Sequence, residues 1–143
     1  GRADTKEPAA WVTGANPERS GSRMTKAHPV RVPEYLQHIV EAIDRATGYV
    51  AGMDAAAFEQ DIRTQDAVIR ALQVVGEAAN KARVADPTLQ SSAPEIPWDV
   101  MYGMRNRIVH DYFEVDLEVV WQTIQRDLPV LRPQIVQLLS RIS

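Results

Sequence analysis

The sequence predicts an all-α protein, an antiparallel bundle of four to five helices in one domain. Apolar residues recur every three or four positions in several long segments, which is the spacing of one buried helix face. No segment shows the sustained alternation of apolar and polar residues that is typical of a strand. The 143 residues are enough to bury one core. The short connections between the predicted helices would place neighbouring helices antiparallel.

The first long helix is expected to begin at Pro33, because proline suits the first turn of a helix. Gly48 and Gly52 weaken its end, and Asp54 then caps a short helical piece over residues 55–60. The apolar stripe of the long helix consists of Tyr35, Leu36, Ile39, Val40, Ile43, Ala46 and Val50.

A longer helix is predicted from residue 61 or 64 to residue 84. Gly76, Ala78 and Ala79 make one side of it thin, which would let another helix approach closely. Asp86 and Pro87 should end it, and residues 88–97 form a loop. The apolar positions of this helix are Val68, Ile69, Leu72, Val75, Ala79 and Ala82.

The next helix is expected to begin near Pro97 and to end around Asp111 or Tyr112. It places one set of apolar residues on the core side, namely Trp98, Met101, Met104, Ile108 and Val109.

The last helix should follow Asp116, a plausible cap, and its apolar residues alternate at spacings of four and three. Pro129 and Pro133 interrupt this pattern, so we expect a kink or a break there. The apolar seam consists of Leu117, Trp121, Ile124, Leu128, Leu131, Ile135, Leu138 and Ile142.

Residues 1–27 are expected to be a tail outside the fold, and residues 28–143 to be the helical domain. The tail is rich in Gly, Pro, Ser and charge and has no apolar period. Ser20 to Arg23 resemble a junction added in cloning before a natural start at Met24, and natural disorder is the alternative.

Composition narrows the class of protein. The absence of cysteine removes disulfides, thiolate metal sites and cysteine nucleophiles, and it fits a reducing, cytoplasmic location. No apolar run approaches the roughly 20 residues that cross a membrane, and the N-terminus lacks the apolar core of a signal peptide. The net charge of -3 argues against a protein that coats nucleic acid, so any RNA function must rest on a local site.

The candidate site lies where charged and titratable residues crowd together at 105–112. The sequence has only three histidines: His28 is at the edge of the tail, His38 lies on the polar face of the first helix, and His110 belongs to this crowded segment. On a helix, Arg105 and His110 are about 140° apart with a rise of roughly 7.5 Å, which is too far for one tight site. Either the helix unwinds near His110 or two chains contribute to one site.

A purely structural interpretation also fits these residues. Basic side chains near the C-terminus of a helix interact favourably with the helix dipole, and a His before a Tyr can cap and pack a helix end.

A resemblance to a known family favours the functional interpretation. Arg105, His110 and Tyr112 match the Arg-x-x-x-x-His-x-Tyr motif, with the polar Asn106 after the arginine. This chain resembles the HepT-like toxins, which are RNases with the HEPN fold. Flanking residues that carry the resemblance lie at 33–39, 64–70, 76–79, 97–98 and 121–129.

The resemblance implies a metal-independent endoribonuclease toxin with no cofactor, active as a homodimer. Its partner would be a nucleotidyltransferase antitoxin of the MntA kind, which would silence it by transferring AMP to Tyr112. In this interpretation His110 is the acid or base and Arg105 holds the phosphate, while Asn106 orients His110 or donates to the phosphate.

Two alternatives remain open at this point. One is a non-catalytic HEPN module that binds nucleotide or a nucleotidyltransferase partner. The other is a plain helical interaction protein that assembles through the thin face at 76–79 and the last helix.

Overall fold

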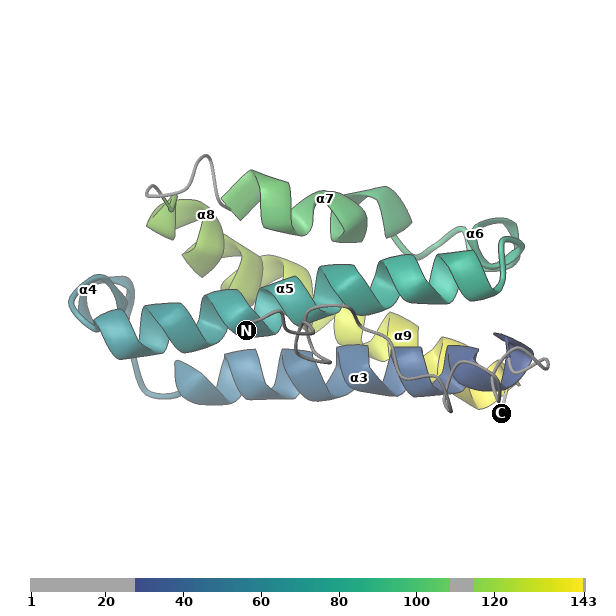
Figure 1. Ribbon diagram of the computed structural model, residues 1–143. Coiled ribbons are helices and arrows are strands. Elements are labelled where there is room, and N and C mark those ends of the chain that lie inside the picture. Colours follow the sequence, from purple (N-terminus) through teal and green to yellow (C-terminus); the bar gives the residue numbers. More distant parts are fainter. Residues whose placement is uncertain (1–27, 109–114, 143) are drawn as a thin grey trace, which may run out of the picture.

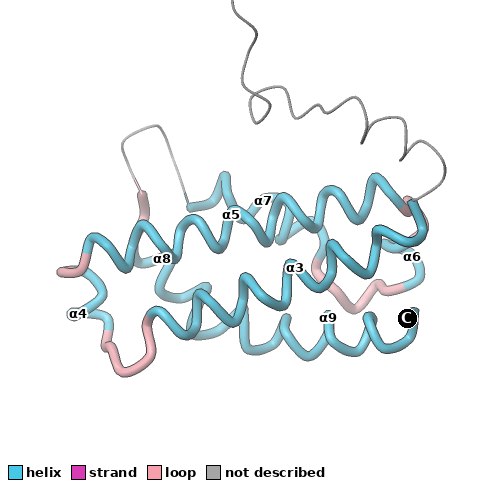
Figure 2. The backbone as a smooth tube through the Cα atoms, turned by 60° about the horizontal axis from the view of Figure 1, so that its bottom comes forward, coloured by secondary structure: helices cyan, strands magenta, loops and turns pink. Residues whose placement is uncertain are grey.

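In the part of the chain that the structure describes, the regular elements are all helices, as the sequence predicts (Figures 1 and 2). The structure is a computed structural model that describes residues 28–108 and 115–142, with the backbone alone at 28–30 and 105–108. None of the helices in these ranges combines the length and the apolar character that crossing a membrane requires.

The first described helix, α3 (His28–Tyr49), begins five residues before the predicted start at Pro33. Its early part contributes to the core, because Val32 is buried. Arg31 also donates a hydrogen bond to the Tyr35 hydroxyl over 3.2 Å. Pro33 therefore lies inside the helix, in its second turn, where its missing N–H removes one backbone hydrogen bond.

Two aspartates begin the next helices. Asp54 caps α4 (Ala55–Glu59), as predicted, and its carboxylate accepts from the Ala57 N–H over 2.8 Å. Asp61 caps α5 (Ile62–Ala85) by accepting from the Thr64 N–H over 3.1 Å. The helix ends at the predicted place, immediately before Asp86 and Pro87.

The connection after α5 is not a plain loop, so that prediction was wrong in part. A short helix, α6 (Leu89–Ser92), forms within it because Leu89 is buried in the core. The next helix, α7 (Trp98–Ile108), begins where expected, and the end predicted around Asp111 or Tyr112 lies outside the described residues. The Trp98 indole N–H donates to the Ala93 carbonyl over 3.0 Å, which ties the connection to the start of α7.

The last predicted helix consists of three consecutive parts: α8 (Leu117–Gln122), the π-helical segment η1 (Thr123–Asp127) and α9 (Leu128–Ile142). Asp116 caps α8 as predicted. Pro129 has no N–H, and the wide turn of η1 ends immediately before it, with the Leu128 N–H bonded to Thr123. The chain therefore adapts to Pro129 with a π turn instead of a break.

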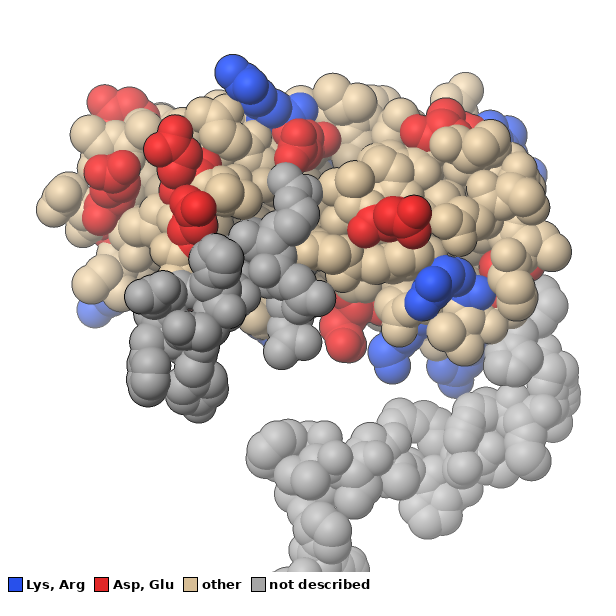
Figure 3. All heavy atoms as spheres, turned by 90° about the horizontal axis from the view of Figure 1, so that it is seen from above, with Lys and Arg blue, Asp and Glu red and all other residues tan. Residues whose placement is uncertain are grey.

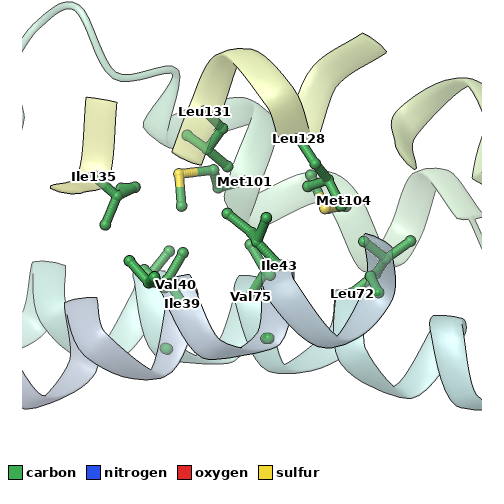
Figure 4. Close-up of a cluster of buried hydrophobic side chains, with 14 of the residues drawn as sticks. Ile39, Val40, Ile43, Leu72, Val75, Met101, Met104, Leu128, Leu131 and Ile135 are labelled. Carbon is green, nitrogen blue, oxygen red and sulfur yellow. The ribbon is translucent and has the colours of Figure 1, made fainter. Parts of the chain in front are cut away.

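The core lies where α3, α5, α7 and α9 converge (Figures 1 and 4). Helix α3 packs against both α5 and α9, and α5 packs against α7. The apolar stripes predicted from the sequence supply this core, as the labelled side chains in Figure 4 show: Ile39, Val40, Ile43, Leu72, Val75, Met101, Met104, Leu128, Leu131 and Ile135.

Candidate functional site

The predicted motif begins on the last turn of α7. The backbone of Arg105 and Asn106 is helical there, which agrees with the sequence prediction. His110, Asp111 and Tyr112 lie outside the described residues. Their proximity to Arg105 therefore stays a prediction.

Helix α7 is anchored firmly to the core just before the motif. Met101 and Met104 are fully buried against α5 and α9, and Trp98 fixes the first turn. Gly76 of α5 lets the two helices come close, since a Cβ atom at that position would lie 3.1 Å from the Met101 carbonyl oxygen. The backbone of Arg105, where the motif begins, is therefore held by the core.

An arginine stacks on a tyrosine where α5 and α7 meet. The guanidinium carbon of Arg83 lies 4.2 Å from the centroid of the Tyr102 ring. Arg83 also donates to the Asn80 side-chain oxygen over 2.7 Å. The Tyr102 hydroxyl is buried and makes no hydrogen bond with the described residues. Burial raises the pKa of Tyr102, whereas the charge of Arg83 opposes that rise and Asp99 adds to it.

The sequence reasoning missed this pair. Arg83 and Tyr102 are 19 positions apart, and neither belongs to the motif at 105–112. Only the antiparallel packing of α5 and α7 brings them together, so no local pattern could have identified them.

A largely apolar pocket of about 260 Å³ lies between α7 and the η1–α9 segment. Val100 and Val130 at its rim are 42% and 61% exposed. Arg126 and Asp127 also line it, and neither forms an ion pair with another described residue. The full lining consists of Pro97, Val100, Met101, Met104, Arg126, Asp127, Val130, Leu131 and Gln134.

Other candidates from the sequence have ordinary positions. His38 is exposed on α3, in agreement with its assignment to the polar face. Glu77 is exposed on α5 and makes no hydrogen bond or ion pair with a described residue. Within residues 28–108 and 115–142, no three His, Asp or Glu side chains gather as metal ligands would.

Charge is distributed unevenly along the molecule. Acidic side chains gather toward the end that holds α4 and α8 (Figure 3). The acidic residues of these two elements and their caps are Asp54, Glu59, Asp116 and Glu118.

Comparisons with known proteins agree with the resemblance seen in the sequence. The family model described as "Ribonuclease HepT-like" matches residues 39–138, a range that contains the whole motif. The chain is similar to "Probable ribonuclease HepT" of Thermococcus cleftensis, with 38% identity over 105 residues, 73% of this chain and 93% of that protein.

Two further relatives are named as inferred RNases. The one from Caldanaerobacter subterraneus subsp. tengcongensis is 28% identical over 107 residues, 75% of this chain and 93% of that protein. The one from Methanocaldococcus jannaschii is 29% identical over 104 residues, 73% of this chain and 93% of that protein. No solved structure matches the chain significantly.

Proposed function

The chain belongs to the ribonuclease HepT-like family, and from this premise we propose that it is a metal-independent endoribonuclease whose site consists of Arg105, Asn106 and His110. The observation that carries the proposal is the family match over 39–138, which includes the uninterrupted motif at 105–112. The anchoring of α7 by Met101 and Met104 supports it, because a catalytic arginine needs a fixed backbone.

The proposed chemistry uses the nucleophile that RNA itself carries. His110 removes the proton of the 2′-hydroxyl or protonates the leaving 5′-oxygen, because imidazole titrates near neutral pH. The guanidinium of Arg105 donates to the phosphate oxygens and stabilises the charge that develops on them. Asn106 orients His110 or donates to the phosphate. The products are a 2′,3′-cyclic phosphate and a 5′-hydroxyl.

The active form in this proposal is a homodimer in which the two segments at 105–112 face a shared groove. The poor helical geometry between Arg105 and His110 within one chain motivates it. The rim of the α7–α9 pocket supports it too, because Val100 and Val130 expose apolar surface beside the motif helix. Around a two-fold axis, Arg126 of one copy can pair with Asp127 of the other.

Control of the enzyme is the third part of the proposal. The protein acts as the toxin of a toxin–antitoxin system, and a nucleotidyltransferase antitoxin silences it. The antitoxin transfers AMP from ATP to the Tyr112 hydroxyl and releases pyrophosphate. The added phosphodiester is negatively charged and competes for the guanidinium of Arg105, which RNA needs.

Expression in a bacterial host tests the toxin function. Induction of the wild-type chain alone should stop growth, and His110→Ala at the same expression level should restore it. Unchanged growth with soluble, folded wild-type protein would contradict the toxin function and favour a non-catalytic helical module.

A further inference from the structure

Two contacts hold the guanidinium of Arg83 in a fixed orientation on the surface. Its face lies on the Tyr102 ring at 4.2 Å, and one of its nitrogens donates to Asn80 over 2.7 Å. Arg83 is otherwise exposed to solvent. An arginine held in this way loses little conformational freedom when it binds a ligand.

The charge of Arg83 has no acidic partner among the described residues. Arg132 and Arg141 differ in this respect, since they pair with Asp44 at 2.6 Å and with Glu95 at 3.4 Å. Arg83 therefore keeps free donors and a full positive charge. Guanidinium donors of this kind bind phosphate oxygens strongly.

Arg83 lies beside α7 on the N-terminal side of the motif, because it stacks on Tyr102. Tyr102 precedes Arg105 by three residues, a rise of about 4.5 Å along the helix, and its side chain leans toward the N-terminus of α7. In the opposite direction, the end with α4 and α8 carries acidic side chains (Figure 3). Arg83 therefore offers an RNA strand at Arg105 a positive charge on the side away from α4 and α8.

We propose that Arg83, positioned by its stack on Tyr102, is an RNA subsite that binds a backbone phosphate flanking the cleaved linkage. The inference deepens the proposed ribonuclease function. It assigns the path of single-stranded RNA along the α5–α7 face, away from the acidic end. In this subsite Arg83 contacts RNA, and Tyr102 acts only as a positioning residue.

The test measures RNA binding and cleavage for substitutions at the two positions. Arg83→Ala should raise KM and the anisotropy Kd for a short single-stranded RNA about tenfold, with kcat retained. The salt dependence of binding should fall by about 0.7 in log–log slope, the contribution of one phosphate contact. Arg45→Ala, which removes an exposed arginine of α3, should leave the KM, the Kd and the slope unchanged.

Substitutions at Tyr102 separate positioning from simple charge. Tyr102→Phe keeps the ring beneath Arg83 and should bind RNA like the wild type. Tyr102→Leu removes the stack but keeps the charge, so it should raise the Kd less than Arg83→Ala does, with an unchanged salt slope.

A wild-type Kd and salt slope in Arg83→Ala would overturn the inference. So would a result in which Arg83→Ala weakens binding to a protein partner but leaves RNA binding unchanged. If Arg83→Ala lowers the melting temperature, Arg83→Gln decides, because it keeps a polar side chain of similar reach without the charge: a raised Kd with a reduced salt slope supports the subsite, and a wild-type Kd and slope refute it. Absence of RNA cleavage by the wild type would contradict the proposed function. The anisotropy measurements would still decide the role of Arg83.

Discussion

A Cβ atom added to Gly76 would lie 3.1 Å from the carbonyl oxygen of Met101, so α5 and α7 are in direct backbone contact at this point. The sequence anticipates a thin side on α5 at 76–79 but not the helix that uses it. That helix is α7, and the contact lies one turn before the predicted motif. The position of the motif therefore depends on a glycine in another helix.

Substitution of Gly76 by alanine should fail to stabilise the protein. Replacing glycine by alanine inside a helix ordinarily raises the free energy of unfolding by about 1 kcal/mol. Here the new methyl group must push the α7 backbone away, which offsets that gain. We expect no rise in melting temperature and a loss of RNase activity. The control is Gly48→Ala in α3, which meets nothing within 4 Å and should raise the melting temperature. Equal stabilisation and full activity in both variants would contradict the close contact.

Substitution of Val130 by aspartate should separate the proposed dimer. The side chain is 61% exposed at the rim of the α7–α9 pocket, so a charge there would be buried in the interface at considerable cost. Light scattering should show a monomer with reduced RNase activity. Val136→Asp is the matched control, because Val136 is an exposed valine of α9 outside the pocket lining. A wild-type monomer that cleaves RNA at micromolar concentration would refute the dimer proposal.

Substitution of Tyr112 by phenylalanine should leave an active RNase that the proposed antitoxin cannot silence covalently. The experiment incubates toxin, partner and ATP, removes the partner, and then measures intact mass and RNase activity. The wild type should gain the mass of one AMP group and stay inactive, whereas Tyr112→Phe should gain no mass and recover. An unmodified wild type that regains full activity would mean that the antitoxin only occludes the site.

Removal of the Asp61 cap should lower stability at neutral pH but not in acid. The hydrogen bonds from Thr64 lower the pKa of Asp61 below its usual value near 3.9. The charged cap therefore adds to the free energy of unfolding at pH values above the usual pKa. This contribution is lost as the pH falls through the lower pKa of the folded state. Asp61→Ala should lower the melting temperature at pH 7, and the difference from the wild type should shrink toward pH 2.

The matched control for Asp61 is Asp66→Ala, which removes a carboxylate from α5 without removing a cap. A difference between Asp61→Ala and the wild type that persists undiminished in acid would argue against the cap as its source.

Local rules predicted much of the fold. The caps at Asp54 and Asp116 and the apolar stripes can be read directly from residue type and spacing. The early start of α3 could not be predicted, because it depends on the tertiary burial of Val32. Similarly, α6 forms within a predicted loop because Leu89 enters the core. Pro129 predicts an interruption, but its residue type does not tell a π turn from a kink or a break.

The candidate site was predictable to a different degree. The motif at 105–112 is contiguous in sequence, so it can be recognised without a fold. Arg83 and Tyr102 meet only through the packing of α5 on α7, and the α7–α9 pocket likewise combines segments distant in sequence. Sites of that kind become visible only when the helices are assembled.

Cleavage of a labelled single-stranded RNA by the purified chain in EDTA tests the central claim most directly. The wild type should cleave without added metal and leave a 2′,3′-cyclic phosphate and a 5′-hydroxyl. Arg105→Ala and His110→Ala should each reduce the rate at least about 100-fold with a nearly unchanged melting temperature, because they remove charge stabilisation or proton transfer. Cleavage that stops in EDTA and returns with a divalent ion, or that survives His110→Ala, would contradict the account.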